Sequence, residues 1–100
     1  GVGDLVRSGD LEGACRAGLA EAREAAGRGD LTVARRRLRR AVRLLPDDVM
    51  FRAELGKVQA RSGRPRKAER SFRRALALAS EAAERARLER LIESIRSGAA

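Results

Sequence analysis

The chain has 100 residues, with 23 Lys and Arg side chains against 14 Asp and Glu, which gives a net charge of +9. Because it contains no His and only one cysteine, Cys15, it can assemble neither a Cys/His zinc site nor a Ser-His or Cys-His nucleophile pair. Most enzyme classes are thereby excluded, and we expect a non-catalytic protein with no cofactor and no metal. The excess of cations predicts an anionic partner, such as nucleic acid, a membrane surface or an acidic peptide, unless it reflects only an Arg-rich coding composition.

No apolar run reaches the length of a membrane-spanning helix, and the first residues lack the pattern of a signal peptide. The single unpaired cysteine agrees with a reducing compartment. We therefore expect a cytoplasmic protein without membrane insertion. Since Phe51 and Phe72 are the only aromatic residues, its core has to be built from Ala, Leu, Val and Ile.

The first expected helix is the least regular one. Residues 1–10 are expected to form an N-terminal tail, and Asp10 offers an N-cap carboxylate to a helix over residues 11–26. Gly13 and Gly18 interrupt this helix at a cost of about 1 kcal/mol each relative to Ala, which predicts either a close approach of another backbone or fraying. Its apolar residues still keep helical spacing and form one stripe: Leu11, Cys15, Leu19, Ala22 and Ala26.

The second expected helix, over residues 31–45, has clear boundaries. Gly29 suits a left-handed stop of the preceding helix, and Asp30 suits the next N-cap. Pro46 ends the helix, because the residue before a proline is pushed out of helical geometry.

Residues 49–61 and 65–79 are the third and fourth expected helices. Asp48 caps the third helix and Gly63 stops it. Pro65 is well placed as the first residue of the fourth helix, where no backbone N–H is needed.

The fifth expected helix reaches from the N-cap Ser80 to about residue 97. It has one apolar stripe on an otherwise charged surface: Leu88, Leu91, Ile92 and Ile95. One apolar and one polar side are what the terminal helix of a stack requires, so we interpret it as a cap.

A repeat organises this series of helices. Residues 27–46 recur thirty-four positions later as residues 61–80, with identical residues at seven aligned positions: Gly29/Gly63, Ala34/Ala68, Arg36/Arg70, Arg39/Arg73, Arg40/Arg74, Ala41/Ala75 and Leu44/Leu78. A helix-turn-helix unit at this interval indicates a stacked helical solenoid. We expect an all-α, right-handed α-solenoid of antiparallel helix pairs with about five helices. Its parts are a first repeat over 11–46, a second over 47–80, and a capping helix with a C-terminal tail over 81–100.

The order of residue sizes in each unit resembles the tetratricopeptide-repeat family. The second unit carries the pattern most fully, in Leu55-Gly56, Gly63, Ala68, Phe72, Ala75-Leu76 and Leu78. The resemblance implies small residues where helices cross: Ala22, Ala34, Ala41, Gly56, Ala68 and Ala75. Residues 8–14 (SGDLEGA) are also similar to residues 28–34 (RGDLTVA). An alternative interpretation is therefore that the first helix is the second helix of a truncated earlier unit.

In this family the first helices of successive units line a concave groove that receives an extended peptide or a partner helix. The resemblance carries seven positions onto such a groove: Arg16, Leu19, Arg23, Met50, Ala53, Lys57 and Arg61. Four of them are cationic, so an acidic peptide or a C-terminal carboxylate would be attracted. The Asn residues of the carboxylate-binding subset are missing, which favours an acidic or amphipathic peptide. The alternative is an unoccupied, solvated groove.

A second candidate surface lies on the outer side of the second helices. Six arginines, here called the arginine ladder, recur at matched repeat positions: Arg36, Arg39, Arg40, Arg70, Arg73 and Arg74. Such a ladder suits nucleic-acid phosphates or another anionic surface. Single-strand binding, however, normally needs aromatic side chains, and none is interleaved here. Nucleic acid is therefore the less favoured partner, and a solvated helical face is the other interpretation.

The N-terminal edge is the third candidate surface. Two repeats fall short of the usual three, which predicts an exposed apolar edge around Leu11, Leu19 and residues 2–6. We expect this edge to pair with a second copy of the chain or with further sequence.

Overall fold

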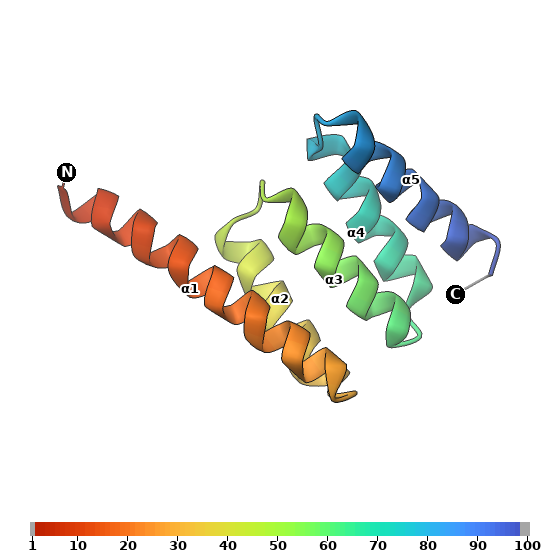
Figure 1. Ribbon diagram of the computed structural model, residues 1–100, viewed down its shortest axis with the longest axis horizontal. Coiled ribbons are helices and arrows are strands. Elements are labelled where there is room, and N and C mark those ends of the chain that lie inside the picture. The colour runs from red at the N-terminus through yellow and green to blue at the C-terminus, as the bar shows by residue number, and fades with distance from the viewer. Residues whose placement is uncertain (1, 99–100) are drawn as a thin grey trace.

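The computed structural model describes the backbone of residues 2–98 and the side chains of residues 9–98. This part of the chain forms five helices and no strand: α1 (Val2–Gly27), α2 (Leu31–Leu44), α3 (Val49–Arg61), α4 (Pro65–Leu78) and α5 (Ala82–Arg96). The predicted all-helical class is confirmed. Figure 1 shows α1 at one end of the molecule and α5 at the other, with α2, α3 and α4 between them.

The main helix contacts run between helices that follow each other in the chain, from α1 on α2 to α4 on α5. The molecule measures 49 × 32 × 19 Å along its principal axes, so this array is thin in one direction. Each helix therefore keeps a side open to solvent. Grooves between non-adjacent helices are also left on the surface.

Local signals in the sequence determine where α2, α3 and α4 begin. The Asp30 carboxylate accepts a hydrogen bond from the backbone N–H of Val33 at 3.3 Å. The Asp48 carboxylate accepts one from the backbone N–H of Phe51 at 3.1 Å. Pro65 is the first residue of α4. The expected boundaries of these three helices agree with the structure to within one residue.

Two glycines allow the turns inside the helix pairs. Gly29 and Gly63 adopt left-handed φ angles of +83° and +73°, where a Cβ atom would be strained. Both were expected as helix stops, and this is confirmed.

The beginning of α1 differs from the expectation. The helix starts at Val2, so residues 2–10 are helical instead of forming a tail, and Asp10 lies inside the helix instead of capping it. Extending an existing helix adds one hydrogen bond per residue, whereas a separate short helix would have to be nucleated, and residues 2–10 contain no proline to stop the extension. Gly1 and residues 99–100 lie outside the described residues.

The glycines of α1 also differ from the expectation. A Cβ atom built on Gly13 or Gly18 would meet no atom within 4 Å, so no other backbone approaches closely at either position. The helix runs through both of them.

The start of α5 is held by another residue than expected. Glu81, not Ser80, occupies the N-cap, and it makes no side-chain capping bond. Instead, Arg85 Nη1 donates to the carbonyl oxygens of Leu76 and Ala79, at 2.9 and 3.0 Å. These carbonyls belong to the last turn and the C-cap of α4, so Arg85 joins the two helices.

The core consists of two clusters that meet at α3. One contains buried residues of α1, α2 and α3, including Leu38 and Phe51, and the other contains buried residues of α4 and α5, including Phe72 and Leu88. The small residues expected at helix crossings are all buried, as predicted: Ala22, Ala34, Ala41, Gly56, Ala68 and Ala75. A Cβ atom on Gly56 would lie only 2.5 Å from Cε1 of Phe72, which shows how closely α3 and α4 approach.

Candidate functional site

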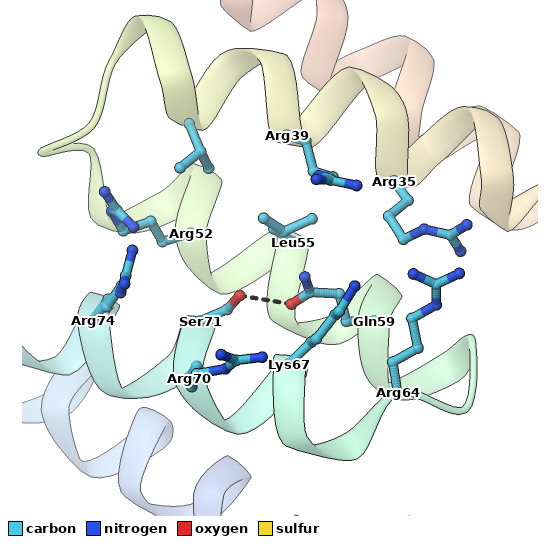
Figure 2. Close-up of a pocket in the computed structure, with 11 residues that line it drawn as sticks. Arg35, Arg39, Arg52, Leu55, Gln59, Arg64, Lys67, Arg70, Ser71 and Arg74 are labelled. Atoms are coloured by element: carbon cyan, nitrogen blue, oxygen red, sulfur yellow. Dashed lines mark hydrogen bonds between the residues drawn. The ribbon is translucent and has the colours of Figure 1, made fainter.

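A hollow of about 260 Å³ lies between α2 and α4, with α3 beneath it. Its floor is formed by Val42, Leu55, Gln59 and Ser71. Seven cationic side chains surround this floor: Arg35, Arg39, Arg52, Arg64, Lys67, Arg70 and Arg74. We call this hollow and its eleven lining residues the basic groove. Figure 2 shows the cations arranged around the floor residues Leu55, Gln59 and Ser71.

Helical spacing places these cations in two walls. Arg35 and Arg39 are one turn apart on α2, and Arg70 and Arg74 are one turn apart on α4. Arg64 precedes α4, and Arg52 comes from α3.

The basic groove carries unbalanced positive charge. None of its lining residues is Asp or Glu. In the part of the chain with described side chains, none of the seven cations forms an ion pair. Arg35 instead donates to the Ser62 hydroxyl at 3.1 Å, and Arg52 donates to the Pro46 carbonyl at 2.6 Å. Both bonds hold a guanidinium in place without neutralising it.

The floor contains a buried polar pair that joins α3 to α4. Ser71 Oγ donates to Gln59 Oε1 at 2.6 Å, and Gln59 is only 7% exposed. Among the described residues no buried side-chain nitrogen or oxygen lacks a hydrogen-bond partner, and Gln59 Nε2, for which no protein partner is seen, is therefore open to the hollow. Since the amide oxygen is held by Ser71, the amide nitrogen is left facing the basic groove (Figure 2).

The expected peptide groove is only partly assembled. Arg23, Lys57 and Arg61 line a second hollow of about 290 Å³ between α1 and α3. Glu54 accepts a hydrogen bond from Arg23 at 3.4 Å and another from Lys57 at 3.2 Å. Arg61 donates to the Ala26 carbonyl at 3.1 Å. The three cations of this α1–α3 hollow therefore already have partners, and two of them share a carboxylate.

The other four expected groove residues are not brought into the α1–α3 hollow. Leu19 is buried in the core and offers no surface to a peptide. Ala53 is half-buried against the cluster of α4 and α5. Met50 and Arg16 are exposed.

The arginine ladder divides among several surfaces. Arg39, Arg70 and Arg74 line the basic groove. Arg36 does not, and instead shares a neighbouring hollow on α2 with Arg39 and Arg43. Arg40 lines a hollow between α1 and α2, and Arg73 pairs with Glu69 at 3.0 Å.

The reason for this division is geometric. Matched positions of two stacked repeats point in the same direction, but the two walls of a groove have to face each other. The α2 wall therefore uses Arg35 and Arg39, while the α4 wall uses Arg70 and Arg74, which align in the repeat with Arg36 and Arg40. Sequence reasoning missed four cations of the basic groove: Arg35, Arg52, Arg64 and Lys67. The spacing of Lys67, Arg70 and Arg74 along one helix was the available signal.

Cys15 is a buried core residue. Burial raises the pKa of its thiol above the usual value, and the charge of Arg40 opposes this shift. The thiol is therefore protonated at neutral pH, which is not the state of a nucleophile.

Among residues 9–98, no group of three or more His, Cys, Asp or Glu side chains is placed to hold a metal ion. In the described part of the chain, no helix combines the length and the hydropathy that crossing a bilayer requires. Compared with known proteins, the chain matches no protein-family model and no curated protein sequence.

Proposed function

We propose that the chain is a non-catalytic protein-interaction module that binds an acidic segment of a partner protein. In this proposal the helices form a right-handed α-solenoid of two tetratricopeptide-like pairs closed by α5. The thirty-four-residue period and the buried small residues Ala34, Gly56 and Ala68 support it. The succession of contacts from α1 to α5 also supports it.

One observation carries the functional part of the proposal. Seven cations surround the basic groove, and none of them is paired with a carboxylate in the described part of the chain. Arginine binds carboxylates through two parallel hydrogen bonds, so a partner with Asp and Glu side chains would find unoccupied donors there. Binding would also relieve the repulsion among the seven charges.

The test is the fluorescence anisotropy of a short labelled peptide that contains a run of Asp and Glu. A peptide of the same length with Asn and Gln at those positions serves as the control. We expect saturable binding of the acidic peptide and at least about tenfold weaker binding of the neutral one, since the neutral peptide loses several charge-assisted hydrogen bonds. Equal affinity for the two peptides would refute the proposed function.

Nucleic acid remains a second candidate because exposed arginines continue from the basic groove along α2. Arg35, Arg36, Arg39 and Arg43 line one surface hollow on that helix. A duplex bound there should lose affinity with salt at about −0.9 log units per log unit for each phosphate contacted. A salt titration with a mixed-sequence duplex measures this slope, and a duplex bound more tightly than the acidic peptide would favour this candidate.

Self-association through the N-terminal edge is a further proposal. Leu11 is half-buried against α2, Leu19 is buried, and the side chains of residues 2–6 lie outside the described residues. Support comes from the length of α1, which has 26 residues against 14 in α2, so that the beginning of α1 extends past its neighbour (Figure 1). A monomeric mass in light scattering at high concentration would refute it.

A further inference from the structure

We infer that the basic groove takes an extended peptide containing a run of consecutive Asp or Glu residues, whose side chains alternate between the α2 wall and the α4 wall. This inference rests on the proposed function and specifies its site and its ligand. It differs from the expectation for this repeat type, in which the first helices, here α1 and α3, would receive the peptide.

The spacing of the cations matches an extended chain. Residues one turn apart on a helix, such as Arg35 and Arg39, are separated by about 6 Å along the axis. In an extended peptide, side chains on the same side recur every second residue, or about 6.6 Å. Two acidic residues at i and i+2 therefore reach Arg35 and Arg39 on α2. The residues at i+1 and i+3 then point toward the α4 wall, where Lys67, Arg70 and Arg74 line the groove.

The floor suits a peptide backbone. Gln59 is more than nine-tenths buried, and its amide nitrogen faces the basic groove without an acceptor among the described residues (Figure 2). Ser71 holds the amide oxygen and so fixes the orientation of the amide. A backbone carbonyl of the bound peptide can accept a hydrogen bond from this nitrogen. The apolar side chains of Val42 and Leu55 also line this part of the groove.

The same floor disfavours a nucleic-acid strand. Single strands are normally bound by stacking of bases on aromatic side chains. The only two aromatic residues, Phe51 and Phe72, are each 1% exposed and belong to the core. A phosphate backbone would engage the walls but would leave its bases without a stacking partner.

The α1–α3 hollow is the weaker site for the same peptide. Glu54 lies between Arg23 and Lys57 and is 17% exposed at its side chain. An acidic peptide would have to compete with this carboxylate for both cations. No carboxylate has that position in the basic groove.

Two charge-reversal variants with the same net charge distinguish the sites. Arg39→Glu with Arg70→Glu removes one cation from each wall of the basic groove. Arg23→Glu with Lys57→Glu removes two cations from the α1–α3 hollow. Both variants are compared with the unmodified chain by anisotropy of the labelled acidic-run peptide, after circular dichroism has shown that their helix content is unchanged.

We expect the basic-groove variant to bind at least about tenfold more weakly than the unmodified chain, and the α1–α3 variant to stay within about threefold. A peptide in which Asp or Glu alternates with Ser can engage only one wall. We therefore expect it to bind about tenfold more weakly than the uninterrupted run.

Three results would overturn the inference. If only the α1–α3 variant loses binding, the proposed function stands but its site is the other hollow. If both variants lose binding equally, the peptide is attracted by the net charge of the protein and does not occupy a defined groove. If an oligonucleotide binds more tightly than the peptide and its binding depends on Arg39 and Arg70, the ligand is nucleic acid. Absence of any peptide binding would instead refute the proposed function itself.

Discussion

Gly56 faces the Phe72 ring across the contact between α3 and α4. Glycine in a helix interior usually costs about 1 kcal/mol relative to alanine. Here the missing Cβ atom is what allows the two helices to approach, because the ring occupies the space that a methyl group would need. The buried ring has no room to move aside.

The substitution Gly56→Ala should therefore lower the free energy of unfolding, by about 1–3 kcal/mol from overpacking, partly offset by the better helix propensity of alanine. Gly13→Ala is the matched control, since a Cβ atom there meets nothing within 4 Å. It should raise stability by about 0.5–1 kcal/mol. Urea denaturation measures both variants, and a stabilised Gly56→Ala protein would show that α3 and α4 are further apart than described.

Cys15 makes stability depend on pH in the alkaline range. Burial raises the pKa of its thiol in the folded state, so its contribution to stability is complete below the unfolded pKa of about 8.5. That contribution is lost as the pH rises toward the folded pKa, at no more than about 1.4 kcal/mol per pH unit. The difference in unfolding free energy between the unmodified chain and Cys15→Ala should thus shrink from pH 7 to pH 10. A constant difference would mean that the thiol is not desolvated.

At the scale of helices, α3 and α4 are joined by the hydrogen bond between Ser71 and Gln59. Ser71→Ala removes the donor and leaves the Gln59 oxygen buried without a partner. It should cost about 1–3 kcal/mol. Ser71→Ala combined with Gln59→Leu removes both polar groups and should cost less than Ser71→Ala alone.

A double-mutant cycle in chemical denaturation measures this coupling. If the two single effects simply add, the hydrogen bond contributes nothing to the α3–α4 contact. The Gln59→Leu variant of this cycle also bears on peptide binding, because it removes the amide that faces the basic groove.

At the scale of the whole molecule, the net charge of +9 acts against folding because like charges repel in the compact state. Raising NaCl from about 20 mM to about 500 mM reduces the range of this repulsion to a few ångströms. If screening contributes about 1 kcal/mol, the thermal midpoint should rise by about 4–8 °C. Differential scanning calorimetry measures this shift.

The groove variant Arg39→Glu with Arg70→Glu should show a smaller rise with salt than the unmodified chain, because part of the clustered repulsion is already gone. Arg16→Glu with Arg90→Glu changes the net charge equally at exposed positions of α1 and α5 that lie outside the basic groove. It should retain most of the salt effect. Identical salt responses of the two variants would show that the clustering of charge has no energetic consequence.

Much of the fold was predictable because its signals are local. Asp30, Asp48, Gly29, Gly63 and Pro65 act within one or two turns of their own positions, so the boundaries of α2, α3 and α4 follow from short segments. The buried stripes follow from helical periodicity in the same way. The predicted start of α1 at residue 11 was wrong, because no local signal marks the true start and residues 2–10 belong to one longer helix.

The candidate site was predictable only in part. The sequence by itself determined that arginines recur one turn apart on the exposed sides of α2 and α4, and that small residues lie at the crossings. Only the tertiary structure decided that Arg35 and Arg39 line one groove with Arg70 and Arg74, and that Glu54 pairs with both Arg23 and Lys57. The physical reason is that periodicity defines directions within one helix. How the faces of two helices are turned toward each other depends on side chains from several helices packing at once.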